Sequence, residues 1–504
     1  MTPNEFIVLL PALTLAAAAL VVLLVDLVLP PERKHLNGWL TLIGFAAAAL
    51  ALTTWPAGGS TLAFSGMLVA DGLAAFLILI FLIAGAVVTV LALGYLPRFG
   101  LERGEAYVLL LLSASGMVLM AQAQDLIMVF LALELLSIPL YVLAGLARPR
   151  LASEEAALKY FLLGAFASGI LVYGIALVFG ATGRTHFAGI LAVQVGPQAQ
   201  ALFDPLLMPF GVALVLAGLG FKIAAAPFHM WTPDVYEGAP SVITAFMSVA
   251  VKAAGFVALL RVFVEAFPLQ AALWTGAVAV LAGLTLIVAN FAALVQSNVK
   301  RMLAYSSIAH AGYLLIAVPA IVNPFSPAVL TDAGPVPLLN AEALGAILFY
   351  LLSYGLTTLG AWAVVMTIER RETDGEPGGL TFDAYRGLWS RRPELALGMA
   401  LFMFSLAGLP PTAGFVGKYL VFSAAIEAGL LWLAVLGVIT SLVSATYYLR
   451  VVVMMFMRPG EPTVAEGWGA RLSVGLMAAA TLLIGLFPYP VIQLAQRSLA
   501  VFVR

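Results

Sequence analysis

Long apolar runs, separated by short charged or Pro/Gly-rich breaks, follow one another along almost the whole chain. A transmembrane helix needs about 20 apolar residues to cross a hydrocarbon core about 30 Å thick. Cut at these breaks, the pattern predicts fourteen membrane-spanning helices and hence an all-α polytopic membrane protein. The predicted spans are residues 5–29, 36–55, 67–96, 107–122, 126–146, 157–180, 205–227, 240–264, 271–295, 302–322, 340–368, 394–424, 430–457 and 472–497.

Composition narrows the possible classes of function. Of the 504 residues, 63% are hydrophobic and 10% are charged, whereas soluble domains have about 45–50% and about 25%. A net charge of −1 leaves no basic excess for binding nucleic acid. The absence of cysteine excludes disulfides, thiolate metal sites and a cysteine nucleophile. The four histidines are scattered, so neither a zinc nor a haem site is expected.

Basic residues in the breaks predict the orientation, because cytoplasmic loops are enriched in Lys and Arg. The breaks after even-numbered spans contain little beyond Arg184. The pattern therefore predicts that both termini lie outside and that the hydrophilic segment 369–394 lies in the cytoplasm. The breaks after odd-numbered spans contain Arg33, Lys34, Arg98, Arg103, Arg148, Arg150, Lys300, Arg301, Arg370, Arg371, Arg386, Arg391, Arg392, Arg458 and Arg471.

Four ionisable residues lie deep inside predicted spans: Glu134, Lys222, Lys252 and Lys418. A charge at the bilayer centre costs about 2.5–3.5 kcal/mol on insertion scales, so the four together would cost roughly 10 kcal/mol if unpaired. A structural Lys–Glu pair is one interpretation, but three lysines and one carboxylate cannot all pair. Proton relays through membranes are built from such groups, and we therefore take the four as relay candidates.

Two of these lysines lie near predicted helix breaks. Pro227 follows Lys222, and Pro410-Pro411 precede Lys418. Proline removes a backbone donor and kinks or ends a helix, and broken spans at matching places in two halves are typical of transporters with inverted repeats. The two lysines are five spans apart. Because five is odd, a repeat of that size would be inverted in the membrane.

Other ionisable residues allow both structural and functional interpretations. His229 is either a hydrogen bonder at the predicted break or a relay residue, and His310 lies in a span among small polar residues. Lys159 follows Glu155 by four residues, so a surface ion pair is the simpler interpretation and a proton-relay role the alternative.

Three further charged residues receive structural interpretations. Arg261 and Glu265, four residues apart near a span end, suggest a local ion pair. Asp71 lies near the end of a predicted span, where we expect the membrane interface.

Four motifs resemble those of the antiporter-like membrane subunits of respiratory complex I. They are LALELLSIPLYVLAG, FKIAAAPFHMWTPDVYEGAPSVITAFMSVAVKAAGF, NVKRMLAYSSIAHAGY and LAGLPPTAGFVGKYLVF. The likeness covers essentially the whole chain and is dense from about residue 125 to 425. The TPDVYEGAP segment and Lys418 favour the subunit N branch of this family. No motif of the first hundred residues or of the segment 369–394 can be matched.

The resemblance implies fourteen helices with two inverted five-helix repeats and two broken helices, the seventh and twelfth. Glu134 matches the glutamate of helix 5 in the family, and Lys222, Lys252 and Lys418 match the lysines of helices 7, 8 and 12. His310 falls in the second repeat, near the residues that connect the two. The expected divisions are an N-terminal group at 1–104, the first repeat at 105–265, the second repeat at 270–458 and a C-terminal helix at 470–504.

By the same resemblance, the expected function is proton translocation within a NADH–quinone oxidoreductase of the bacterial inner membrane. No cofactor is expected in this chain. NADH, FMN, iron–sulfur clusters and quinone are expected in partner subunits, and the other membrane subunits are the expected partners. Two alternatives remain open at this point: a subunit of a multi-subunit sodium/proton antiporter, and a passive membrane scaffold whose buried charges only fix assembly.

Overall fold

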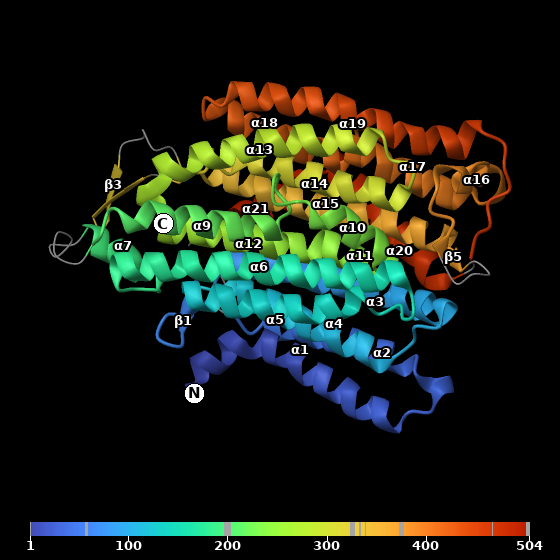
Figure 1. Ribbon diagram of the computed structural model, residues 1–504, viewed down its shortest axis with the longest axis horizontal. Helices are drawn as coiled ribbons and strands as arrows, with labels where there is room; N and C mark the ends of the chain where they lie inside the picture. The colour runs from blue at the N-terminus through green and yellow to red at the C-terminus, as the bar shows by residue number, and fades with distance from the viewer. Residues whose placement is uncertain are drawn as a thin grey trace.

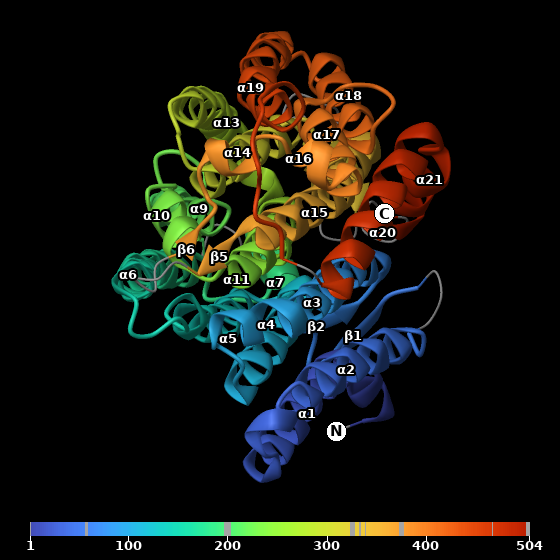
Figure 2. The ribbon, with the colours of Figure 1, turned by 90° about the vertical axis from the view of Figure 1, so that its right-hand side faces the viewer.

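The protein is a bundle of long helices that run side by side, as the computed structural model shows (Figure 1). The view along the helices places α1 and α2 at one edge and α18 and α19 at the far edge (Figure 2). The structure describes residues 2–55, 59–195, 203–322, 328–331, 334–337, 339–371, 377–465 and 467–499.

The elements of the first half are long helices and one short hairpin, β1–β2, in which Thr61 pairs with Ala70. In chain order they are α1 (Pro3–Val28), η1 (Pro31–Arg33), α2 (Leu36–Leu52), β1 (Thr61–Ala63), β2 (Leu68–Ala70), α3 (Gly72–Phe99), α4 (Gly104–Gln122), α5 (Leu126–Ala144), α6 (Leu151–Thr182), α7 (Phe187–Val195), α9 (Leu207–Lys222), α10 (Trp231–Gly238), α11 (Ser241–Phe246), the π-helical η2 (Met247–Val251), α12 (Lys252–Arg261) and the π-helical η3 (Val262–Ala266).

The second half also consists mainly of helices, with two further short antiparallel strand pairs, β3–β4 and β5–β6. Its elements are η4 (Pro268–Gln270), α13 (Ala271–Leu294), α14 (Val299–Ala317), β3 (Ala328–Thr331), β4 (Gly334–Pro337), α15 (Ala341–Ile368), β5 (Arg370–Arg371), β6 (Pro377–Gly378), η5 (Phe382–Tyr385), α16 (Leu388–Arg391), α17 (Pro393–Ala407), α18 (Ala413–Glu427), α19 (Leu431–Met457), α20 (Trp468–Leu486) and α21 (Tyr489–Ser498).

The prediction of an all-α polytopic membrane protein is confirmed. Within the described residues, eleven helices are long and apolar enough to cross a membrane, and two shorter apolar helices, Leu207–Lys222 and Pro393–Ala407, accompany them. The count of fourteen spans and the inverted repeats stay predictions.

Several predicted spans differ from the helices observed. The span at 67–96 begins only at Gly72, because residues 68–70 form β2 and the turn before it holds Phe64, Ser65 and Gly66 at positive φ. The span at 205–227 ends early, at Lys222, and the spans at 394–424 and 472–497 are each divided into two helices. The span at 157–180 begins earlier, at Leu151, which places Glu155 and Lys159 inside the helix.

Close packing of α5, α6 and α9 forms one wall of the buried polar region described below. A side chain at Gly174 of α6 would meet the backbone of Val215 at 2.8 Å, and one at Gly211 of α9 would meet the backbone of Val178 at 3.0 Å. Small residues let membrane helices approach in this way. On α4, a side chain at Gly116 would meet the backbone of Leu136 on α5 at 2.5 Å.

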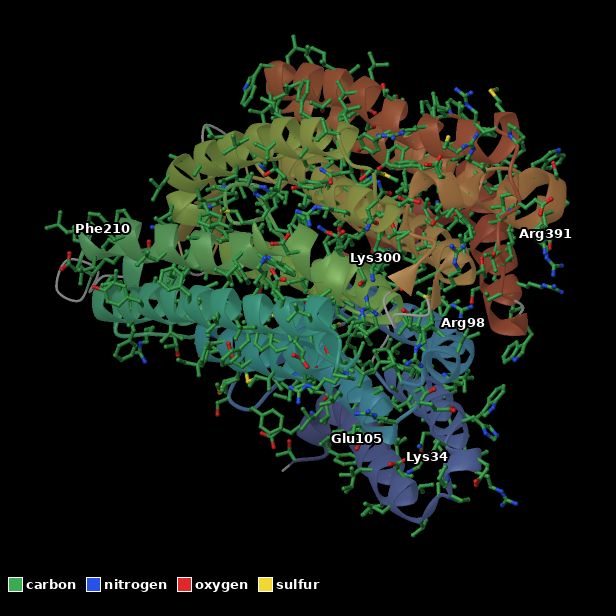
Figure 3. The ribbon with its side chains drawn as sticks, turned by 45° about the vertical axis from the view of Figure 1, so that its right-hand side comes forward. Lys34, Arg98, Glu105, Phe210, Lys300 and Arg391 are labelled. Atoms are coloured by element: carbon green, nitrogen blue, oxygen red, sulfur yellow. The ribbon has the colours of Figure 1, made fainter. Side chains whose placement is uncertain are left out.

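The two ends of the bundle differ in charge. Lys34, Arg98 and Arg391 lie toward one end and Phe210 lies toward the other (Figure 3). The indole of Trp55 donates to the carbonyl of Ile7 at 3.1 Å, and Ser498 in α21 lies against Gly72 at the start of α3. Val8 of α1 packs with Leu68 and Ala70 of β2, directly before α3. The beginning of α1 and the end of α21 therefore both lie near the start of α3, away from the end that carries Lys34, Arg98 and Arg391, which we call the arginine-rich end.

Candidate functional site

The first helix break follows Lys222, the last residue of α9. Pro227 has no N–H, and its ring would collide with the carbonyl four residues earlier, that of Ile223. The helix therefore ends before the proline, and Ala224 adopts a positive φ of 61°. The backbone groups freed by the break find partners in other helices. Ala226 N–H donates to Thr285 Oγ1 on α13 at 2.8 Å, and the carbonyl of Ile223 accepts from Lys252 at 3.4 Å.

Lys222 is buried, with 4% of its surface exposed. Its ammonium donates to Ser137 Oγ on α5 at 2.7 Å and to Tyr160 Oη on α6 at 3.2 Å. The ammonium also lies 5.4 Å from the centre of the Tyr160 ring. Hydroxyl groups both accept and donate hydrogen bonds, so these partners can pass a proton to or from the lysine.

Glu134 lies on α5, one turn before Ser137, and is partly buried. Its Oε1 accepts a hydrogen bond of 2.5 Å from Ser168 Oγ on α6. No ion pair joins Glu134 to Lys222 among the described side chains. A small cavity of about 10 Å³, bounded among others by Ser168, Lys222 and Tyr141, lies beside them, and this volume is near the smallest that holds one water molecule.

Lys252 connects the first break to the second half of the chain. It is buried at the start of α12, and its ammonium donates to the carbonyl of Ser307 on α14 at 2.8 Å as well as to that of Ile223. A cation beside the carbonyl end of a helix is stabilised by the helix dipole. The Oγ of Ser307 in turn accepts from Tyr354 Oη on α15 at 3.0 Å.

His310, one turn after Ser307, lies in a cluster of tyrosines. Its Nδ1 is 2.8 Å from Tyr350 Oη on α15, and its Nε2 is 3.1 Å from Tyr448 Oη on α19. The Tyr448 hydroxyl lies 2.5 Å from Ser306 Oγ. Both ring nitrogens therefore have a hydroxyl partner, which is the arrangement that a histidine relay requires.

The second break separates α17 from α18. Ala407, the last residue of α17, presents its carbonyl to Lys418 Nζ at 2.9 Å. The same ammonium donates to Ser441 Oγ on α19 at 2.8 Å and lies 4.5 Å from the centre of the Tyr313 ring on α14. Lys252 and Lys418 thus each compensate the free carbonyl end of a broken helix.

The structure places Lys222 at the first break, bonds Lys252 to the carbonyl of Ile223 in that break, and links Lys252 through Ser307 to the His310 cluster. The ring of Tyr313 packs edge-on against His310 at 5.6 Å between ring centres and also faces Lys418. The four residues that sequence analysis selected inside the spans therefore line one polar region that crosses the bundle, together with His310.

The remaining candidates lie apart from this region. His229 is in the turn between α9 and α10, and its Nδ1 has no hydrogen-bond partner within the described residues. Lys159 pairs with Glu155 at 2.6 Å, as the surface interpretation expects, and also with Asp234 on α10 at 2.7 Å.

Sequence analysis missed the hydroxyl groups that surround the ionisable residues. Ser137, Tyr160, Tyr350 and Tyr448 are buried and bonded to them through their hydroxyls, and Ser307 is buried and bonded to Lys252 through its backbone carbonyl. Their signal was present as serines and tyrosines inside apolar spans, one helical turn from a charge in the cases of Ser137 and Ser307. In the part of the chain that the structure describes, no group of His, Asp or Glu is arranged to hold a metal ion.

A family model described as "NADH:quinone oxidoreductase/Mrp antiporter, TM" matches residues 123–326 and 336–444. The chain is 45% identical to NADH-quinone oxidoreductase subunit N of Trichlorobacter lovleyi, over 97% of this chain and 96% of the relative. It is 46% identical to subunit N of Chloroflexus aggregans, over 99% and 98%.

Solved structures give the same picture. A chain of respiratory complex I from Thermus thermophilus, with aureothin bound, aligns with a TM-score of 0.78 at 38% identity and covers 96% of this chain and 98% of that one. A chain of the Mrp complex from Dietzia sp. aligns with a TM-score of 0.82 at 21% identity, over 99% and 97%, and this likeness concerns the fold alone.

Proposed function

Because this chain belongs to the NADH:quinone oxidoreductase and Mrp antiporter family of membrane proteins, we propose that it is a proton-translocating subunit N of a NADH–quinone oxidoreductase. It is a multi-pass membrane protein. The observation that carries the proposal is the polar region that joins Lys222, Lys252, His310 and Lys418 between the two broken helices. Charges buried in a membrane are costly, and a polar row across the bundle is the arrangement that a proton relay needs.

Each of the ionisable residues has a distinct role in this proposal. Glu134 and Lys222 form the coupled pair at one side, where loss or gain of a proton on one changes the charge that the other faces. Lys252 and His310 carry the proton between the halves, and Lys418 releases it. His229 and Lys159 are secondary candidates, because neither has a hydrogen bond to this region in the described part of the chain.

The arrangement of the helices supports a division into two repeats. The proposed first repeat, 105–265, contains the α9–α10 break, and the proposed second repeat, 270–458, contains the α17–α18 break. Residues 1–104 and 470–504 flank them. We place the arginine-rich end in the cytoplasm of a bacterial cell and both termini outside its inner membrane, because basic residues favour the cytoplasmic side.

Electron transfer from NADH to quinone belongs, in this proposal, to partner subunits that carry FMN, iron–sulfur clusters and quinone. This chain then contributes proton movement and no redox chemistry of its own. Its partners are the other membrane subunits, and the exposed apolar side chains on α5 and α6, such as Leu131 and Phe166, suit either a lipid or a subunit contact.

The test uses the assembled complex in inverted membrane vesicles, with NADH oxidation and dye-reported proton uptake measured together. Lys222→Met keeps the length and apolar stem of the side chain but removes the exchangeable proton. We expect assembly to persist and proton pumping to fall at least tenfold. Lys34→Met is the matched control, because Lys34 lies in a loop at the arginine-rich end and pairs with Asp26 at 2.8 Å. Normal pumping by an assembled Lys222→Met complex would contradict the relay.

The alternatives give different results in the same preparation. A sodium/proton antiporter subunit would purify with antiporter subunits and without NADH-oxidising activity. If the chain is a passive scaffold, substitution of Lys222 would reduce assembly of the complex. Any complex that did assemble would then pump protons normally.

A further inference from the structure

A buried carboxylate at the end of α15 stands apart from the row of lysines. Glu369, the residue after α15, has 1% of its surface exposed. Its Oε1 accepts from Tyr95 Oη on α3 at 3.0 Å, and its Oε2 has no hydrogen-bond partner within the described residues. Buried carboxylate oxygens are ordinarily hydrogen-bonded, so this free oxygen is a place where a proton or a water molecule can bind.

A buried lysine lies within electrostatic range of this carboxylate. Sequence analysis placed Lys300 in a loop, but it is fully buried in the first turn of α14, where its ammonium donates to the carbonyl of Ala239 at 2.6 Å. The guanidinium of Arg98 also interacts with Glu369, and Tyr385 is a further neighbour. Two cationic side chains, Lys300 and Arg98, therefore lie within electrostatic range of this buried carboxylate.

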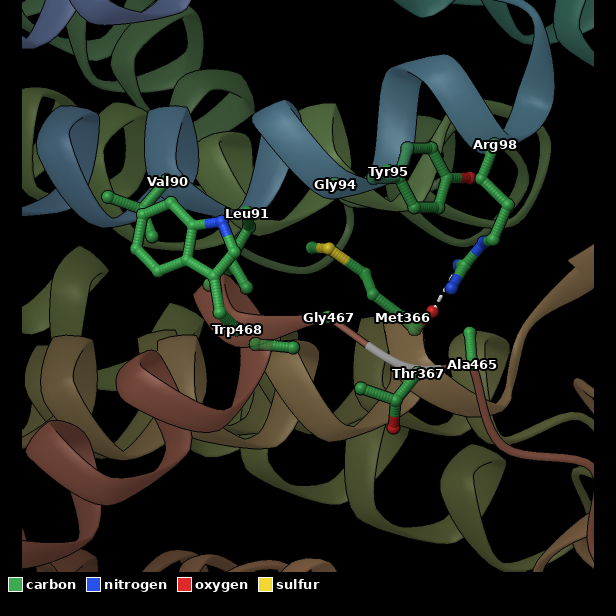
Figure 4. Close-up of a pocket in the computed structure, with 12 residues that line it drawn as sticks. Val90, Leu91, Gly94, Tyr95, Arg98, Met366, Thr367, Ala465, Gly467 and Trp468 are labelled. Atoms are coloured by element: carbon green, nitrogen blue, oxygen red, sulfur yellow. Dashed lines mark hydrogen bonds between the residues drawn. The ribbon is translucent and has the colours of Figure 1, made fainter.

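A pocket of about 50 Å³, with room for a few water molecules, lies between α3 and the last turn of α15, close to this carboxylate. Tyr95 and Arg98 of α3 form part of its wall, and Met366 and Trp468 lie across from them (Figure 4). Arg98 donates to the carbonyl of Met366. Since Tyr95 lines the pocket and also bonds to Glu369, it connects the pocket to the buried carboxylate.

Polar groups continue from Glu369 along one face of α15 toward the centre of the bundle. Trp362 and Thr358 each bury a polar atom that has no partner among the described residues, and Tyr354 bonds to Ser307 at 3.0 Å. At 100° per residue, Tyr354, Thr358, Trp362 and Glu369 fall within about 80° of one another and span about 22 Å along the helix. The stripe ends at Ser307, whose carbonyl binds Lys252.

We propose that this stripe is the proton-uptake branch of the relay, in which Glu369 takes protons from the arginine-rich end through the Tyr95–Arg98 pocket and delivers them toward Lys252. The proposal rests on the proposed function. Glu369 accepts on its free oxygen a proton that the aqueous phase supplies as hydronium, which leaves neutral water, and it releases the proton inward. Each hydroxyl then accepts one proton and gives up its own, so no charge is left behind. The Trp362 N–H only donates, and it holds water in line rather than relaying.

A second pocket at the same end of the bundle is an alternative entrance for protons. It has a volume of about 440 Å³ and is lined, among others, by Lys159, Asp234, Glu237 and Arg301. Its charges are already joined to one another: Arg301 pairs with Asp234 at 2.9 Å and with Glu237 at 2.6 Å. Groups held in such pairs are less free to exchange protons than the unpartnered oxygen of Glu369, and we therefore favour the α15 branch.

The test replaces the proton-carrying groups in the assembled complex, in inverted vesicles. Glu369→Gln keeps an oxygen for Tyr95 but cannot titrate. We expect proton pumping and NADH oxidation to fall about tenfold, equivalent to about 1.4 kcal/mol in the barrier. Glu369→Asp should retain most of both activities. A small membrane-permeant weak acid, such as formic acid, should restore the Glu369→Gln complex and leave Lys222→Met blocked.

Two controls separate this branch from a structural role. Thr358→Val removes a hydroxyl from the stripe at nearly constant volume and should lower pumping. Thr357→Val is its neighbour on another face, where its hydroxyl bonds to Ser353 and Ser405, and it should leave pumping unchanged. If Glu369→Gln fails to assemble, the Asp and Thr358→Val complexes decide the question in the same assay.

The outcomes are distinguishable. Normal pumping by Glu369→Gln together with blocked pumping by Lys222→Met overturns the uptake branch and leaves the proposed function intact. Blocked pumping by Glu237→Gln together with normal pumping by Glu369→Gln would show that protons enter through the second pocket. This result also overturns the uptake branch. Normal pumping by both Glu369→Gln and Lys222→Met overturns the proposed function itself.

Discussion

The buried cluster around Arg261 gives the sharpest prediction about stability. The Arg261 side chain is fully buried, with Nη2 at 2.7 Å from Asp71 Oδ1 and Nη1 at 2.9 Å from Glu265 Oε1. Its Nε donates to the carbonyl of Ala121 at 2.7 Å, and Gln124 binds the second oxygen of Glu265 at 2.5 Å. The guanidinium therefore ties together the start of α3, the end of α4 and the end of the α12 segment.

Arg261→Met leaves two carboxylates without their counter-ion. Removal of one partner from a buried ion pair costs about 3–5 kcal/mol, and the unpaired Ala121 carbonyl adds about 1–3 kcal/mol. Asp71 also caps α3 by accepting from Ala74 N–H at 2.8 Å, so the damage extends to that helix start. We expect a loss of at least about 3 kcal/mol, roughly two powers of ten in the folded-to-unfolded ratio.

The assay is the amount of this chain in the assembled complex, followed on native gels, and the temperature at which it dissociates. Changes of about 1–2 kcal/mol already alter abundance several-fold, so Arg261→Met should leave almost no assembled chain. Arg458→Met is the control, because Arg458 is exposed at the end of α19 and surface changes cost less than about 0.5 kcal/mol.

A triple variant tests the reasoning more directly. Arg261→Met combined with Asp71→Asn and Glu265→Gln removes every charge of the cluster, and replacing a whole buried ionic group is often neutral. We expect the triple variant to recover much of the assembly lost by the single one. Equal assembly of Arg261→Met and Arg458→Met, or a triple variant no better than Arg261→Met, would refute the argument.

The same cluster shows where sequence analysis reached its limit. The local pair of Arg261 and Glu265 was expected from their spacing of four residues, and it is confirmed. Asp71 was expected at the membrane interface, and this stays a prediction; the structure adds that Asp71 is 7% exposed and bonded to Arg261, 190 residues away. The sequence shows that a charged residue lies near the end of a span, but it does not show which distant helix packs against that residue.

Most of the fold was predictable because the bilayer restricts the choices. Backbone groups in lipid must bond internally, so long apolar runs such as 341–368 could only be helices. The β1–β2 hairpin was not predicted, because residues 67–70 are apolar and were therefore assigned to the following span. The positive φ angles of Phe64 and Ser65 are set by the turn, and hydropathy does not reveal them.

The candidate site divides in the same way. Lys222, Lys252 and Lys418 were identifiable because a lysine inside an apolar run has few structural explanations. Their partners were not: the carbonyl of Ile223 becomes available to Lys252 only because Pro227 ends α9 early, and α12 happens to lie against that break. Lys300 was misplaced in a loop for a similar reason, since the residue that covers it, Ala239, belongs to another segment.

Three further predictions test the orientation and the relay. Ser390→Cys, beside the arginine-rich segment, should react with an impermeant thiol reagent only from the cytoplasmic side and Ser60→Cys only from outside; the reverse pattern would invert the topology. Glu134→Gln and Lys222→Met should each reduce pumping, and the double variant should fall short of the summed losses by about 0.5–3 kcal/mol, as coupled residues do; additive losses in assembled complexes would count against a coupled pair. Lys418→Arg keeps the positive charge beside the α17 carbonyl end but hardly ever releases its proton, so it should be nearly as damaging to pumping as Lys418→Met while assembly persists. If the arginine variant pumps normally in vesicles, Lys418 serves only as a fixed counter-charge for the broken helix and proton release takes place elsewhere.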